Sequence, residues 1–97
     1  MLRHVVLFRL IEDAPEGAMQ SLQDALSGLA QSIPDISSYT YGLDLGLRDG
    51  NFDLAVVADF VDEQAFERYV DHPDHQSFVA DLLKPVLAER VELQFDL

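Results

Sequence analysis

The stretch YVDHPDHQSF, residues 69–78, gathers one tyrosine and two of the chain's three histidines around a proline. Imidazole has an unperturbed pKa of about 6.5 and phenol one of about 10. His75 can therefore accept a proton near neutral pH while Tyr69 donates a hydrogen bond to an oxygen that gains negative charge. This pairing suits enolisation and aldol chemistry without a cofactor, so both residues are candidate catalytic groups.

The same stretch also has a purely structural interpretation. Tyr69 closes one predicted helix, His72 precedes a proline, and His75 lies in the first turn of the next helix, where its nitrogens can bind exposed backbone groups. We favour the structural role for His72 and leave both roles open for His75 and Tyr69. His4 lies on an apolar strand, where a hydrogen-bonded core histidine is the commoner case, and it is the third catalytic candidate.

A metal site is the weaker alternative for this stretch. Asp71, His72, Asp74 and His75 offer oxygen and nitrogen ligands, but adjacent acid and histidine side chains point in divergent directions. No further histidine or cysteine lies nearby to complete a closed zinc site. The sequence therefore predicts no metal and no other cofactor.

The composition limits the partners that these residues can serve. The chain has 97 residues, enough for one domain spanning 1–97 with its own core. Eighteen acidic residues against six basic ones give a net charge of -12, which disfavours nucleic acid and anionic membrane surfaces. The chain has no cysteine, no apolar run long enough to span a membrane and no signal-peptide pattern, so we expect a cytoplasmic protein.

Hydrophobic periodicity predicts four strands and a helical segment after the first and third of them. Asp13 and Glu16 have capping-box spacing, which predicts that the first helix begins there and continues until Pro34. Asp62 is a predicted N-cap, and a proline divides the second helical segment in two. The predicted strands are 2–10, 38–46, 51–61 and 91–97, with the second and third joined as antiparallel neighbours.

This order is βαββαβ, the ferredoxin-like arrangement, an α+β fold with a four-stranded antiparallel sheet and helices on one face. The strands at 2–10 and 51–61 are apolar on both parities, so the other face of the sheet needs an apolar cover. The chain has no segment left to provide it. We therefore expect a homodimer in which two sheets face each other and form an α/β barrel.

Four features resemble the stress-responsive dimeric α/β barrel family, known as Dabb: HVVLFRL near the start, YGLDLG, FDLAVVADF with its acidic cap, and above all YVDHPDHQSF. The resemblance spans nearly the whole chain and implies the same dimeric ferredoxin-like fold. Most members have no defined activity, some plant members are linked to stress tolerance, and one is a plant cyclase that closes a linear polyketide to olivetolic acid.

Residue by residue, the resemblance to the cyclase implies roles for three positions. The catalytic tyrosine and histidine of that enzyme match Tyr69 and His75, and a first-strand histidine matches His4. Two other pocket residues of the cyclase, a tyrosine and a histidine, fall near Leu26 and Leu54 here. We therefore expect a small apolar or aromatic ligand in a pocket between helices and sheet; the alternative is a cofactor-independent polyketide cyclase, isomerase or lyase that uses His75 and Tyr69.

Overall fold

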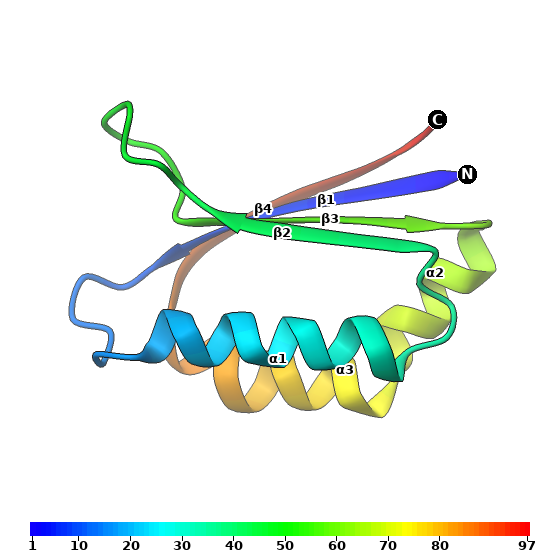
Figure 1. Cartoon of the computed structure of the whole chain (residues 1–97), viewed down its shortest axis with the longest axis horizontal. Coiled ribbons are helices and arrows are strands. Elements are labelled where there is room, and N and C mark those ends of the chain that lie inside the picture. The colour runs from blue at the N-terminus through cyan, green and yellow to red at the C-terminus, as the bar shows by residue number, and fades with distance from the viewer.

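The computed structural model describes residues 1–97 and shows a four-stranded antiparallel sheet with all helices on one face (Figure 1). The strands follow the order β2-β3-β1-β4 across the sheet. The elements along the chain are β1 Leu2–Leu10, α1 Ala18–Ser32, β2 Ser38–Leu43, β3 Leu54–Phe60, α2 Glu63–Asp71, α3 Pro73–Ser77, the π-helical η1 Phe78–Leu83, the 3-10 turn η2 Lys84–Val86 and β4 Leu87–Asp96. This confirms the predicted ferredoxin-like α+β fold.

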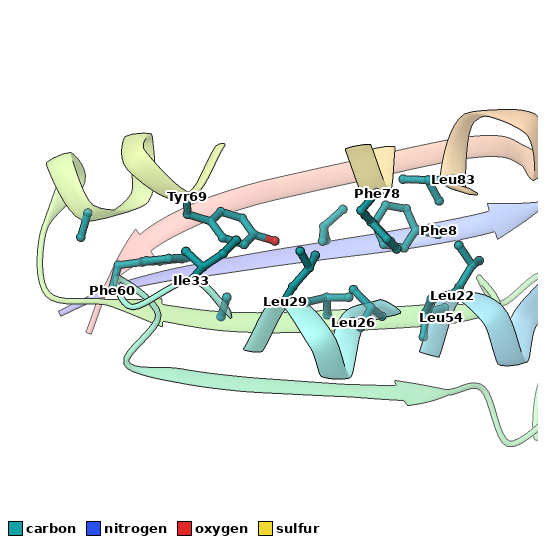
Figure 2. Packing of buried hydrophobic residues seen from close by; sticks show 14 of the residues in the cluster. Phe8, Leu22, Leu26, Leu29, Ile33, Leu54, Phe60, Tyr69, Phe78 and Leu83 are labelled. Atoms are coloured by element: carbon teal, nitrogen blue, oxygen red, sulfur yellow. The ribbon is translucent and has the colours of Figure 1, made fainter. Parts of the chain in front are cut away.

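The core lies between the sheet and the helix layer. Alternate residues of β1 and β3 point towards the helices and are buried, among them Phe8 and Phe60. Leu22, Leu26 and Leu29 recur along one side of α1 and pack against them (Figure 2). The spacing of three and four residues places these leucines on one helix face, which explains why α1 lies flat on the sheet.

The opposite side of the sheet, here called the open face, has no helix over it. Residues of the two central strands that point to this side are half-buried and mostly apolar, including Val5, Leu7 and Val57. Arg3 and Asp59 also lie here, paired through two hydrogen bonds of 2.8 and 2.9 Å. The prediction that the uncovered sheet face is apolar is therefore confirmed.

The start of α1 differs from the prediction. The helix begins at Ala18, not at Asp13, and its N-cap is Gly17, which has a left-handed backbone with φ of 87° and no side-chain cap. A residue in this conformation cannot continue a right-handed helix, so Asp13 and Glu16 lie in turns that precede it. The predicted end, just before Pro34, is confirmed.

The second helical segment is interrupted, as predicted, and in more than one way. Asp62 caps α2 by accepting the backbone N–H of Ala65. His72 is extended before Pro73, which separates α2 from α3. The chain then continues as the π-helical η1, and Pro85 lies in the 3-10 turn that follows it.

The start of the last strand also differs from the prediction. β4 begins at Leu87, four residues earlier than predicted, and the side chains of its apolar row are exposed in the single chain. Val91, Leu93 and Phe95 are 44%, 57% and 45% exposed because they pair with residues of β1 that point to the open face. β4 is an edge strand, so its apolar row extends the open face. No helix of the chain has the length and apolar character to cross a membrane.

Candidate functional site

A cavity of about 130 Å³ lies between the sheet and the segment that runs from α2 to η1; we call it the histidine cavity. Apolar side chains make up most of its wall. The groups that can do chemistry are His4, Tyr39, Tyr69, His75, Arg90 and Glu92. The structure therefore brings the three predicted site residues to one place, although 71 positions separate His4 from His75 in the chain (75 − 4 = 71).

His75 is half-buried at the start of α3, and its two ring nitrogens have different surroundings. Nδ1 lies 3.2 Å from the carbonyl oxygen of Val70, near the end of α2. A carbonyl only accepts, so Nδ1 carries the proton and donates it. In the neutral ring Nε2 is then an unprotonated nitrogen that can accept a proton, which is the form that a general base needs.

His4 has the opposite arrangement. It is buried on β1 and lies directly across from Gln94 of β4, whose Nε2 is 2.9 Å from Nδ1 of His4. An amide N–H only donates, so Nδ1 accepts and Nε2 of the neutral ring carries the proton. The same amide nitrogen lies 3.4 Å from Oε1 of Glu92. The bond from Gln94 therefore fixes the tautomer of His4 in which Nε2 carries the proton and can donate a hydrogen bond.

Both free ring nitrogens remain open to a ligand. Neither Nε2 of His4 nor Nε2 of His75 forms a hydrogen bond within the chain. Every fully buried side-chain nitrogen and oxygen in the chain does have a hydrogen-bond partner, so these two atoms are not fully buried. Each Nε2 atom is thus accessible, and both rings line the same cavity. One imidazole can accept a proton and the other can donate a hydrogen bond.

Tyr69 and Tyr39 form a pair of phenols beside these rings. Their Oη atoms are 2.9 Å apart, and the ring of Tyr69 lies 4.4 Å from that of His75, centroid to centroid. Figure 2 shows the oxygen of Tyr69 pointing into the space between sheet and helices. In this hydrogen bond one hydroxyl donates its proton to the oxygen of the other, so the O–H of the accepting phenol is left to donate to a ligand.

Burial sets the protonation of these groups. It lowers the pKa of His4 and of His75, so both rings are neutral at neutral pH. The carboxylate of Glu92 opposes this shift at both rings, and the Val70 carbonyl opposes it at His75. Burial also raises the pKa of Tyr69 and of Tyr39, which keeps the phenols protonated as donors.

An ion pair on the edge strand forms the polar side of the cavity. Nε of Arg90 lies 3.4 Å from Oε2 of Glu92, and both side chains are partly exposed. Arg90, Glu92 and Gln94 were not among the site residues predicted from the sequence. Their even positions in the alternating strand were the one indication in the sequence that they share a sheet face. In the structure they pair with the β1 residues that point towards the helices.

His72 and a third tyrosine, Tyr41, lie outside the histidine cavity. His72 does not line the cavity; its Nδ1 accepts the backbone N–H of Asp74 at 3.1 Å and so caps α3. Tyr41 packs against the core without reaching the cavity, whereas its neighbour in parity, Tyr39, does reach it. The chain contains no group of three or more histidine or acidic side chains placed to hold a metal ion.

Fold and site together define a small α+β protein with a ferredoxin-like sheet, an internal cavity and an uncovered apolar face. The model of the stress responsive A/B barrel domain, Dabb, matches residues 2–97, and the chain belongs to this family. An uncharacterized protein of Streptomyces coelicolor is 30% identical over 82 residues, which cover 82% of this chain and 84% of that protein.

Solved structures share the same fold. A dimeric ferredoxin-like protein of unknown function from Thermobifida fusca has a TM-score of 0.91 and 44% identity, covering 99% of this chain and 90% of that one. The hydroxynitrile lyase of Passiflora edulis has a TM-score of 0.84 and 20% identity, covering 97% of this chain and 90% of the lyase. The family thus includes proteins without a known activity, and the same fold occurs in an enzyme.

Proposed function

We propose that the protein binds a small, uncharged, single-ring compound in the histidine cavity and works as a homodimer through its open face. The observation that carries the first part is the cavity itself: its wall is mostly apolar, and four polar side chains from β1, β2, α2 and α3 converge on it. Apolar pockets with a few convergent polar groups are the usual form of small-molecule sites.

The size of the cavity selects the ligand. At about 130 Å³ it is close to the engineered cavities of about 150 Å³ that bind benzene. Pockets for drug-sized molecules start at about 300 Å³. One aromatic ring with a carbonyl or hydroxyl group fits this space, whereas a long linear polyketide exceeds it. The size therefore favours the isomerase or lyase over the polyketide cyclase among the enzymatic alternatives.

The charges around the cavity favour a neutral ligand. Glu92 lies at its polar side, and the chain as a whole has a net charge of -12. Arg90 is the cation at that side and already pairs with Glu92. An anionic compound would meet this field and lose water without gaining a free cation.

Binding is tested with phenol and benzaldehyde by titration calorimetry or NMR shift changes. Val79 lines the cavity, and Val79→Phe should fill it and abolish binding of the single-ring compounds. Ala80→Phe places the same ring on the exposed neighbouring position and is the matched control. Equal binding by both variants, or no binding by the wild type, would contradict the proposed site.

A lyase or isomerase activity is the second candidate, supported by the complementary protonation of the two imidazoles. Nε2 of His75 would take a proton from the carbon next to a carbonyl group; the C–H electron pair would form a C=C bond, and the π pair of the carbonyl would move onto its oxygen. The N–H of His4 and the free phenol O–H would stabilise the resulting enolate. Where the enolate is conjugated with a further C=C bond, return of the proton to its γ-carbon completes an isomerisation; departure of a leaving group from the β-carbon with its bonding electron pair completes an elimination.

This activity is tested by hydrogen–deuterium exchange at the α-carbon of phenylacetaldehyde in D2O, followed by NMR. Exchange should be faster with the wild type than in buffer and should fall to the buffer rate with His75→Ala. His72→Ala is the control, because His72 lies outside the cavity, and it should keep the wild-type rate. Exchange that is equally fast in His75→Ala would remove His75 from the mechanism.

The dimer part of the proposal rests on the open face. Val5, Leu7 and Val57 at its centre and the exposed apolar row of β4 form one continuous apolar surface on the sheet. A monomer would leave this surface in water, whereas a second copy placed face to face would bury it. Covering a whole sheet face gives an interface above about 1,200 Å², the size of stable complexes.

A further inference from the structure

The loop between β2 and β3, residues 44–53, rises from the sheet on the side opposite the helices (Figure 1). It carries two leucines that are almost fully exposed: Leu45 at 84% and Leu47 at 78%. Both line an apolar groove of about 520 Å³ together with Leu7, Phe52 and Ala55. Exposed apolar groups gathered around a groove mark an interaction surface.

The loop is fixed in place by its own contacts. The carboxylate of Asp44 accepts the N–H of Gly46 and the side-chain amide of Asn51, each at 3.0 Å. The guanidinium of Arg9 donates to the carbonyls of Gly50 and Asn51, both at 3.1 Å. A loop held by these bonds loses little conformational entropy when it binds a partner.

The same anchoring continues on the sheet side of the loop. The Arg9 guanidinium lies 4.2 Å above the centre of the Phe52 ring, and the N–H of Asp53 donates to the Phe8 carbonyl at 2.9 Å. Gly46 and Gly50 have φ angles of 76° and 80°, which residues other than glycine rarely adopt. The loop therefore has one defined shape, with its leucines outward.

We propose that this loop is an arm that grips the second copy of the chain when the two open faces meet. The inference rests on the proposed dimer and adds to it the element that fastens the partner. We choose a second copy as the partner because the groove is continuous with the open face. Leu7 and Ala55 belong to both, so a copy that packs on the open face also reaches the groove.

The charges of the loop agree with a second copy as the occupant. The loop contains Arg48 together with Asp44, Asp49 and Asp53, and Arg9 anchors it, so these residues carry a net charge of only -1 in a chain whose net charge is -12. Two copies therefore meet less repulsion here than the acidic remainder of the chain would impose. An apolar surface with little net charge suits self-association.

The test is a dilution series by sedimentation equilibrium with three proteins: the wild type, the double variant Leu45→Ser/Leu47→Ser, and Leu82→Ser. Leu82 is an exposed leucine of η1 on the helix side and serves as the matched control. The dimer dissociation constant should rise about tenfold or more in the double variant and stay at the wild-type value in Leu82→Ser. Far-UV circular dichroism verifies that each variant is folded.

The possible failures are distinct. A monomeric wild type would overturn the dimer and with it the arm. A wild-type dimer whose dissociation constant is unchanged by the double substitution would overturn the arm alone.

A second measurement does not depend on weakening the dimer. The chain has no cysteine, so Leu47→Cys introduces a single thiol, and Leu82→Cys is its control. The thiol at position 47 should react slowly with a disulfide reagent when the protein is dimeric and faster after dilution to monomers. The thiol at position 82 should react at one rate throughout. The same concentration-independent rate at both positions would overturn the proposed arm.

Discussion

The two ring nitrogens of His75 have different surroundings, and the proposed roles of the ring in stability and in binding can be separated by substitution. Its Nδ1 satisfies the Val70 carbonyl near the end of α2, while Nε2 is left for the cavity. The carbonyl can exchange this partner for water because the ring is only half-buried. Tyr69 is different, since it is buried and bonded to Tyr39.

We therefore expect His75→Ala to lower the free energy of unfolding by no more than about 0.5 kcal/mol. Tyr69→Phe removes one member of a buried hydrogen bond and should cost about 1 to 3 kcal/mol. Both should weaken binding of phenol or benzaldehyde. Urea unfolding and calorimetry on the two variants measure this. Strong destabilisation by both substitutions, with a wild type that binds no single-ring compound, would assign the residues to the helix connection alone.

The protonation of the buried rings predicts a dependence of stability on pH. Burial lowers the pKa of His4 and His75 in the folded protein, so the unfolded chain binds more protons below its ordinary histidine pKa of about 6.5. Stability should therefore be complete above about pH 6.5 and fall as the pH drops towards the lowered values. Asp59, whose pKa Arg3 lowers, adds a further loss only below about pH 4.

Unfolding in urea at pH 7.5 and pH 5.5, at one protein concentration, measures this effect. His75→Gln should show a smaller loss between the two pH values than the wild type, because one of the two shifted groups is gone. His72→Gln is the comparison, since His72 lies outside the cavity. A wild type that is as stable at pH 5.5 as at pH 7.5 would contradict the burial of neutral imidazoles.

At the scale of elements, the connection between α2 and α3 positions residues of the histidine cavity, while its own side chain, His72, lies outside that cavity. Pro73 stops α2, and His72 caps the next helix so that His75 turns back towards Tyr69. The cap is a side-chain nitrogen where Ser, Asp or Asn is the usual choice. Its contribution is therefore structural and can be replaced by another acceptor.

His72→Ala should destabilise the protein by about 1 kcal/mol through loss of the cap on Asp74. His72→Asn restores an acceptor of similar reach and should recover most of this loss. Ligand affinity should be the same in the wild type and in both variants, provided that binding is measured where each is fully folded. A loss of binding in His72→Asn, with stability intact, would place His72 in the site after all.

At the scale of the whole molecule, the apolar open face determines the state of association. Leu93 lies in the middle of the exposed apolar row of β4, and a charge there would be buried in the dimer. Leu93→Asp should therefore give folded monomers or unfolded protein at micromolar concentration. Ala80→Asp places the same charge on the exposed helix side and should leave the dimer intact. Light scattering measures both, and a monodisperse wild-type monomer would contradict the prediction.

The sequence by itself determined the order of elements and the class of fold. Periods of two and of three to four residues identify β1 and α1 because each element buries one face or stripe. Local signals also fixed Asp62 as a cap and the break at Pro73. The predicted start of α1 was wrong, since the capping-box pattern does not show that Gly17 has a left-handed backbone conformation.

Only the tertiary structure decided which side chains meet. The pairing of β1 with β4 places Gln94 opposite His4 and so fixes the proton on Nε2, a relation that no local pattern contains. The same register turns Leu93 towards the open face, because residues that pair across antiparallel strands point to one side of the sheet. Periodicity shows that a strand has two faces, but the neighbours that decide which face is covered come from distant parts of the chain.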